Sequence, residues 1–236
     1  MKKKIELTYG KTVRGIMFAV NPIKKIILKT QCITHKYIND KAVNILKNEG
    51  YLDEYKLFKK YLKFLNEGVT WADQDFRSTN HFYHYEKQKG LYGFSNALDE
   101  CLKYYNKALA YVDAGDVGRG MFYFGAACHL VQDATVPQHV NNHLLNKHRN
   151  FELWIISKIL SNYPYSVQKG IKNYKNTCDY VKNNALFANK IDMKYDYVKN
   201  VDLRYKKISQ EILREAQVTT AGLMLKFSSE IKKYLT

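Results

Sequence analysis

The sequence predicts an all-α protein, organised as one compact domain of several helices. Apolar residues recur every three or four positions through most of the chain, which is the spacing of one buried helix face. Alternating apolar and polar runs, which would indicate strands, are rare, and only three prolines interrupt 236 residues. A chain of this length can bury one sizeable core, so two small domains are the less favoured alternative.

The first two expected helices lie in residues 34–68. The first begins at Thr34, an N-cap residue type, and ends at Gly50, because glycine readily takes the left-handed conformation that closes a helix. The second carries an apolar stripe over residues 55–65 and ends at Gly68.

The next two expected helices occupy the middle of the chain. One is opened by Ser95 and closed by Gly115, and the other is capped by Asp116. The second of these runs through the small residues Gly125-Ala126-Ala127. It ends before Pro137, because proline cannot donate a helical hydrogen bond.

Three more helices are expected in the rest of the chain. Asn141 or Asn142 caps the fifth, and two further apolar stripes predict helices over 165–190 and 202–234. Irregular chain is expected at 1–30 and 68–94.

The formal net charge is +16 with the histidines neutral, so the surface should attract anions such as phospholipid headgroups, nucleic acid or phosphate esters. The lysines are spread along the whole chain, and solvated helix faces explain them as well as a binding patch does. The four cysteines form no CxxC pair, and so few cysteines in a chain this long do not predict a disulfide framework.

The N-terminal residues 1–30 read as a basic extension. Their apolar run, residues 15–20, is shorter than the core of roughly 7–15 residues that a signal peptide carries. No stretch approaches the roughly 20 apolar residues of a membrane span. By sequence alone we therefore expect a soluble, cytoplasmic protein.

Histidines and acidic residues recur at helical spacing between residues 129 and 152. His129 and Asp133 are four apart, so both side chains leave one face of a helix, and His148 and Glu152 repeat that spacing. His139 lies between the two pairs, just after a proline. Imidazole nitrogens and carboxylate oxygens are the usual ligands of a hydrolytic zinc ion.

A single pair of this kind is more often a surface ion pair than a metal site. Two such pairs separated by a third histidine are much less common by chance, and apolar residues surround the first pair. Buried charges need a partner or a metal ion. The pattern therefore favours a metal site.

The segment H-L-V-Q-D-A-T-V-P-Q-H-V-N-N, residues 129–142, resembles the signature of the bacterial zinc-dependent phospholipases C. The preceding F-Y-F-G and the following H-R-N-F-E, residues 122–125 and 148–152, are similar to that family's flanking motifs. Three further segments match in the family's order over about residues 32–230: T-H at 34–35, G-V-T-W-A-D at 68–73 with H-F-Y at 81–83, and A-Q-V-T-T-A-G at 216–222. The resemblance implies a catalytic domain over 31–236 with the all-helical fold shared by phospholipases C and P1 nucleases. The family is usually secreted, although this chain has no evident signal peptide.

The resemblance implies a cluster of three zinc ions and assigns ligands to each. One ion would be bound by Asp73, His81, His129 and Asp133, and a second by His139, His148 and Glu152. The third would be bound by His35, with Asp133 bridging it to the first ion. It also implies Asp73 as the general base that activates water.

Two departures from the family pattern stand out. The family's third ion is bound by the amino group and carbonyl of an N-terminal tryptophan, whereas here no tryptophan precedes Trp71. Two zinc ions are therefore expected, and the third lacks its usual partner; Cys32 has the spacing to replace it, although a buried neutral thiol is the ordinary reading. In the substrate pocket Phe82 matches an aromatic that binds the headgroup, but Gln74 and Ser78 stand where further aromatics are expected.

The implied activity is hydrolysis of glycerophospholipids to diacylglycerol and a phosphorylated headgroup by metal-activated water, with phospholipid as substrate and peripheral contact with a membrane surface. One alternative is an S1/P1-type zinc nuclease acting on single-stranded nucleic acid, whose final ligand pair usually reads H-x-x-W-D. A further alternative is a non-catalytic zinc-bound structural or membrane-surface module. His84 and His143 match no ligand position and are expected at the surface or in support of the ligands.

Overall fold

The computed structural model describes residues 32–74, 79–90, 95–141 and 146–234. These residues form eight α-helices and one short 3-10 helix, with no strand among them, which confirms the all-α prediction. The elements are α2 (Ile33–Asn48), α3 (Leu52–Ala72), α4 (Ala97–Asp113), α5 (Val117–Asp133), α6 (Pro137–Val140), α7 (Asn146–Leu160), α8 (Thr177–Lys194), α9 (Val201–Ile231) and η3 (Lys232–Tyr234). The predicted N-terminal extension, 1–30, lies outside the described residues.

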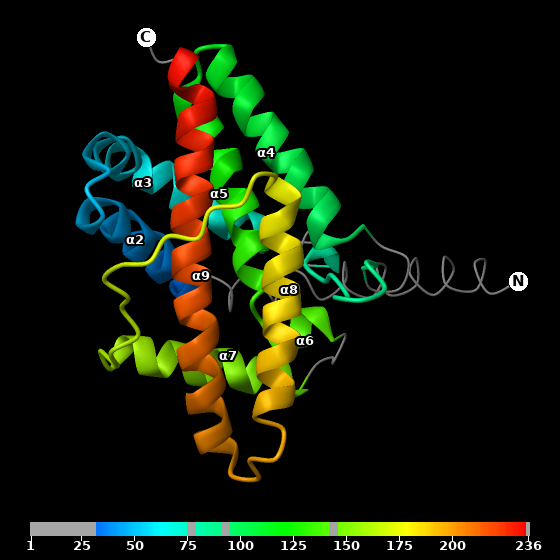
Figure 1. Cartoon of the computed structure of the whole chain (residues 1–236). Helices are drawn as coiled ribbons and strands as arrows, with labels where there is room; N and C mark the ends of the chain where they lie inside the picture. The colour runs from blue at the N-terminus through cyan, green and yellow to red at the C-terminus, as the bar shows by residue number, and fades with distance from the viewer. Residues whose placement is uncertain (1–31, 75–78, 91–94, 142–145, 235–236) are drawn as a thin grey trace, which may run out of the picture.

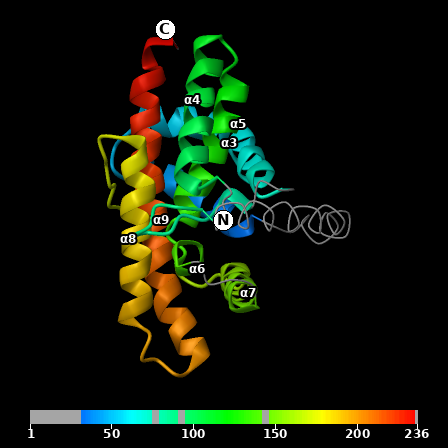
Figure 2. The ribbon, with the colours of Figure 1, turned by 90° about the vertical axis from the view of Figure 1, so that its right-hand side faces the viewer.

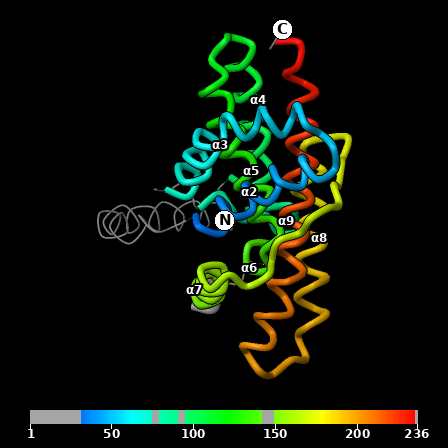
Figure 3. Tube along the Cα trace, turned by 90° about the vertical axis from the view of Figure 1, so that its left-hand side faces the viewer, coloured from blue at the N-terminus to red at the C-terminus, as the bar shows by residue number. Residues whose placement is uncertain are grey.

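Helix α9 runs the length of the molecule with α8 beside it, and α7 crosses near the end at which the connection between them lies (Figure 1). Helices α2 and α3 lie on the opposite side of α9 from α8 in that view, and α4 and α5 rise together towards the C-terminus (Figure 2). The tube in Figure 3 shows α2 and α3 crossing in front of the α5–α9 pair. None of the described helices is both long and apolar enough to cross a membrane.

Helix α5 is the centre of the core, and its most extensive contacts are with α3 and α4. Its second half is buried on every side, from Phe124 to Asp133. The small residues predicted there allow the backbones to approach closely. A Cβ on Gly125 would lie 2.0 Å from the carbonyl oxygen of Leu65, and one on Gly68 would lie 1.8 Å from that of Phe122. The histidine–aspartate pair of α5 is thus held in a rigid, buried setting.

The contact at Gly68 also explains why one predicted helix end is wrong. Helix α3 does not stop at Gly68 but continues to Ala72, so residues 68–72 are helical rather than irregular. The glycine is needed for the approach of α5, a tertiary reason that a local turn signal does not reveal. The extra turn brings Asp73, the C-cap residue, to the end of α3.

Other helix ends agree with the sequence in part. Asp116 caps α5 as predicted, accepting a hydrogen bond from the Arg119 amide, and Gly115 has a positive φ of 82°. Helix α4 is capped by Asn96 instead of Ser95. Helix α2 starts after Cys32, whose φ is 72°, and not at Thr34.

The segment around Pro137 is more ordered than predicted. Pro137 begins the four-residue helix α6, which carries His139. Asn141 is the C-cap of α6 rather than the N-cap of the next helix. The alternative cap, Asn142, lies outside the described residues. Helix α8 begins only at Thr177, so the first part of the predicted 165–190 helix is irregular chain that is hydrogen-bonded to α9.

Candidate metal site

Side chains from four helices and one connecting segment converge at the C-terminal end of α5. The convergent residues are His35 in the first turn of α2, Asp73 at the end of α3, His81 in the segment that follows, His129 and Asp133 on α5, and His139 on α6. His129 and Asp133 share one helix face because they are four residues apart. Asp73 ends α3, which packs against α5, and His139 is on α6, which follows α5 in the chain. The fold also brings in His35, which is 98 residues from Asp133 in the sequence.

Asp133 is the hub of this cluster. Its Oδ2 lies 2.8 Å from His81 Nδ1, 3.1 Å from His129 Nε2 and 3.8 Å from His139 Nδ1, while its Oδ1 lies 3.4 Å from His35 Nε2. His129 is 1 % exposed and Asp133 and His81 are 3 % exposed, so water does not satisfy these groups. The ring of His129 also stacks on that of His35, with centroids 4.0 Å apart.

One ring nitrogen of each of three histidines donates a hydrogen bond to an oxygen that does not belong to Asp133. His81 Nε2 donates to the carbonyl of Ala72 (3.0 Å), His139 Nδ1 to the carbonyl of His81 (3.3 Å), and His35 Nδ1 to Oε1 of Gln132 (2.9 Å). Such bonds fix the tautomer and the ring orientation of a metal ligand. When the ring is neutral its second nitrogen carries a lone pair, and for His35 and His81 that nitrogen is the one beside Asp133.

The donor atoms are spaced as ligands of one small cation would be. Two atoms bound at about 2.0–2.1 Å to a tetrahedral zinc ion lie roughly 3.3 Å apart. His129 Nε2 and His81 Nδ1 are 3.2 Å apart. Although nitrogens lie within 3.1 Å of Asp133 Oδ2, this buried oxygen has no well-aligned hydrogen bond. A convergent, poorly hydrogen-bonded set of nitrogen and oxygen atoms fits a metal ion.

Two overlapping groups have all their ligand atoms within 4.8 Å of one another. One is His35, His129 and Asp133, and the other is Asp73, His81 and His129. Together they contain every residue that the sequence assigned to the first and third zinc positions.

Electrostatics keep the Asp133 carboxylate ionised and two of its histidine neighbours neutral. Burial lowers the pKa of His35 to about 4 and also lowers the pKa of His129, so both rings are neutral. Burial alone would raise the pKa of Asp133, but its close contacts with His129, His139 and His81 hold it well below its usual range. At His81 the effect of burial is outweighed by the contact with the Asp133 carboxylate, which raises the pKa of the ring. The ionised carboxylate and the neutral rings of His35 and His129 suit zinc, whereas His81 must lose the proton that Asp133 favours before it can bind the ion.

The second predicted ligand set is described only in part. His139 lies at the edge of the cluster, with Phe82 stacked on its ring at a centroid distance of 4.9 Å. His148 belongs to α7, but its side chain is outside the described residues. Glu152 is on the exposed side of α7 and belongs to neither ligand group. The second zinc position therefore stays a prediction.

Sequence reasoning missed the supports of the cluster. Gln132 and the Ala72 carbonyl orient two of the histidines, and only the folded arrangement reveals them. The Cys32 thiol, whose pKa is raised by burial, lies 3.7 Å from Oδ2 of Asp73. His84 is outside both ligand groups, as expected, and its Nδ1 accepts from the backbone amides of Glu86 and Lys87. His143 lies outside the described residues.

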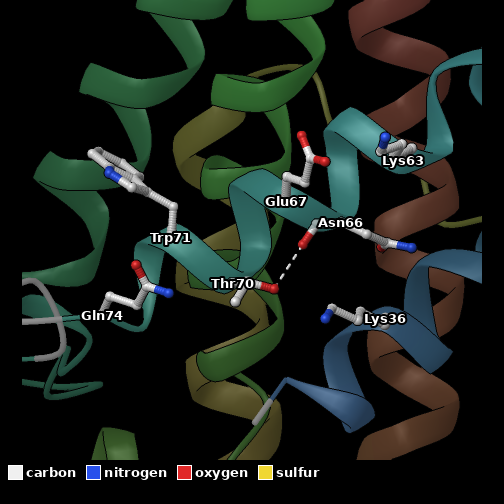
Figure 4. Close-up of a pocket in the computed structure, with 7 residues that line it drawn as sticks. All are labelled: Lys36, Lys63, Asn66, Glu67, Thr70, Trp71 and Gln74. Atoms are coloured by element: carbon white, nitrogen blue, oxygen red, sulfur yellow. Dashed lines mark hydrogen bonds between the residues drawn. The ribbon is translucent and has the colours of Figure 1, made fainter. Parts of the chain in front are cut away.

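A hollow of about 550 Å³ opens between α2 and α3 (Figure 4). Its lining is polar apart from one indole ring and comprises Lys36, Lys63, Asn66, Glu67, Thr70, Trp71 and Gln74. Lys36 directly follows His35 and Gln74 directly follows Asp73, so two of the lining residues are sequence neighbours of candidate ligands. The two lysines give it a local positive charge.

Comparison with known proteins agrees with this geometry. The family model of zinc dependent phospholipase C matches residues 34–203. Among solved structures, the alpha toxin from Clostridium absonum matches with a TM-score of 0.72 and 19 % identity, covering 84 % of this chain and 64 % of the toxin. The alpha-toxin of an avian strain of Clostridium perfringens matches with a TM-score of 0.72 and 18 % identity, covering 85 % of this chain and 64 % of the toxin.

At these identities the toxins show the shared fold, and the chain corresponds to less than two thirds of their length. No curated protein matched at a significant level. The family model, in contrast, spans most of the chain and includes all the candidate ligands from His35 to Glu152. The chain therefore belongs to the zinc-dependent phospholipase C family.

Proposed function

We propose that the protein is a zinc-dependent phosphodiester hydrolase that cleaves glycerophospholipids to diacylglycerol and a phosphorylated headgroup. The observation that carries the proposal is the buried cluster centred on Asp133, in which neutral imidazoles and an ionised carboxylate converge. A purely structural ion pair would not need four histidines around one carboxylate. Membership of the zinc-dependent phospholipase C family supports the same reaction class.

The residues present would hold at least two zinc ions. Asp73, His81, His129 and Asp133 form the first position, and His35 with Asp133 contributes to a neighbouring one. His139, with the predicted ligands His148 and Glu152, completes the proposed set. When bound, zinc would supply Lewis-acid stabilisation of the phosphate and lower the pKa of bound water to about 7.

Asp73 is the proposed general base. Its carboxylate ends α3 within the second ligand group, where it accepts a weak hydrogen bond from the Cys32 thiol. In the proposed reaction the oxygen of water bonds to phosphorus while Asp73 takes its proton, and the bond from phosphorus to the diacylglycerol oxygen breaks. That oxygen leaves towards solvent, where it is protonated.

The hollow between α2 and α3 is the proposed path for the substrate. Lys36 and Lys63 would attract the anionic phosphodiester, and Trp71 supplies a flat apolar wall (Figure 4). Phe82 is buried against the His139 ring. It is therefore proposed to shape the pocket by fixing that ring as well as by meeting the headgroup.

The proposal is tested by incubating the protein separately with short-chain phosphatidylcholine, phosphatidylethanolamine and single-stranded DNA, each with and without a zinc chelator. We expect chelator-sensitive release of a phosphorylated headgroup from at least one lipid. Release of nucleotides without any phosphorylated headgroup would replace the proposal with the nuclease. Turnover of none of the three by zinc-loaded protein would favour a non-catalytic zinc module.

A further inference from the structure

A row of side-chain amides leads from the hollow to the candidate ligand His35. Asn66, which lines the hollow (Figure 4), accepts at Oδ1 from Nδ2 of Asn39 at 2.9 Å. Asn39 in turn accepts from Gln132 Nε2 at 2.8 Å, and Gln132 Oε1 accepts from His35 Nδ1 at 2.9 Å. Asn39 and Gln132 are 0 % and 1 % exposed, so the row is shielded from water.

The direction of the hydrogen bonds along this row determines which ring nitrogen of His35 carries the hydrogen. An amide oxygen only accepts, so the nitrogen facing Gln132 Oε1 must be N–H. Neutral His35 then keeps its lone pair on Nε2, the atom 3.4 Å from Asp133 Oδ1. The opposite polarity would present the Gln132 amino group to His35, place the hydrogen on Nε2, and remove the lone pair from the metal-facing side.

His35 differs in this respect from its neighbours. His81 and His139 each donate a hydrogen bond from one ring nitrogen to a main-chain carbonyl, which can only accept. A side-chain amide, in contrast, can rotate by half a turn and present its NH2 donor in place of its oxygen. Gln132 is held against this rotation because its Nε2 donates both to Asn39 and, at 3.2 Å, to Oγ1 of Thr220 on α9.

We propose that Gln132 is a positioning residue that sets the tautomer of His35, with Asn39 and Thr220 fixing the orientation of the Gln132 amide. The consequence for zinc affinity rests on the metal site proposed above, whereas the tautomer is a property of the metal-free protein. Three elements, α2, α5 and α9, thus determine which atom of His35 faces the ion.

The test is nitrogen-15 NMR of the histidine side chains in the full-length, metal-free protein at neutral pH, with His35 assigned from the signals lost in His35→Gln. We expect a pyrrole-type Nδ1 and a pyridine-type Nε2. Gln132→Met keeps the side-chain length but removes both polar atoms, and should shift His35 towards the Nε2–H tautomer. Gln132→Glu retains an acceptor for Nδ1–H and should restore the wild-type pattern.

Zinc binding gives a second readout, measured by competition with a chromophoric chelator. Gln132→Met should weaken binding at the His35 position by about 10–100-fold, the usual effect of removing a hydrogen-bond partner of a metal-ligating histidine. Asn184→Leu is the matched control. Asn184 is also fully buried and donates to α5, at the Val131 carbonyl 2.8 Å away, but it touches no candidate ligand. It should leave both the tautomer and the zinc affinity unchanged.

An Nε2–H tautomer in the wild-type protein, or a wild-type pattern and affinity in Gln132→Met, would overturn the proposal. If Gln132→Met does not fold, Thr220→Val removes one anchor of the amide and should give a mixture of the two tautomers; an unmixed wild-type pattern would count against the proposal. Absence of zinc binding by the wild-type protein would refute the metal site itself, and the tautomer measurement would still test the role of Gln132.

Discussion

Replacing His35 with glutamine should change how the stability of the metal-free protein depends on pH. Burial lowers the pKa of His35 from 6.5 to about 4, so the unfolded chain takes up a proton at this residue before the folded protein does. The stabilisation that neutral His35 provides is therefore complete above pH 6.5 and is lost as the pH falls towards 4. Proton linkage with these two values gives a loss of about 2 kcal/mol between pH 7 and pH 5.

The assay is urea unfolding in the presence of a chelator at pH 7 and pH 5, for the wild type, His35→Gln and His84→Gln. The unfolding free energy of the wild type should fall by about 2 kcal/mol more than that of His35→Gln over this interval. His84→Gln removes a histidine outside the cluster and should follow the wild type. Parallel pH dependences for the wild type and His35→Gln would refute the neutral state assigned to His35 in the folded protein.

Three further substitutions test other parts of the structure. Asp133→Asn removes the charge that four histidines surround and should weaken zinc binding by at least about 10-fold in a chelator competition; wild-type affinity would contradict its position as the hub. His129→Ala should abolish phosphodiester hydrolysis while His84→Ala leaves it nearly intact, and equal losses would discredit the ligand assignment. Gly125→Ala places a Cβ 2.0 Å from the Leu65 carbonyl oxygen and should lower the unfolding free energy by about 1–3 kcal/mol or more; unchanged urea denaturation would show that α3 and α5 are less tightly packed than described.

Helical periodicity was sufficient to predict the all-α class and the approximate place of most helices. It mispredicted a helix end where a glycine is required by a tertiary contact and not by a local turn. Gly68 has the appearance of a helix stop, yet it lies inside α3 because the backbone of α5 passes within reach of its missing side chain.

The residues before α8 show a second kind of failure. These residues carry apolar side chains at helical spacing but do not form a helix, since α9 offers them hydrogen-bond partners. The amide of Val167 donates to the Gln217 side chain and that of Lys172 to the Val218 carbonyl. Local apolar spacing does not distinguish such an irregular segment, docked on α9, from a helix.

The candidate site could likewise be predicted only in part. The spacing of His129 and Asp133 indicates a metal-binding face, and resemblance to a family extends the set to His35, Asp73 and His81. The polarity of each imidazole could not be predicted, because it depends on partners far along the chain. Gln132 lies 97 residues from His35.

The central claim is that the cluster around Asp133 binds zinc. Elemental analysis of protein purified from zinc-supplied medium tests it most directly, with Asp133→Asn analysed in parallel. We expect at least two zinc ions per wild-type chain and a marked loss in the variant. Fewer than one zinc ion per wild-type chain, with the protein folded, would contradict it.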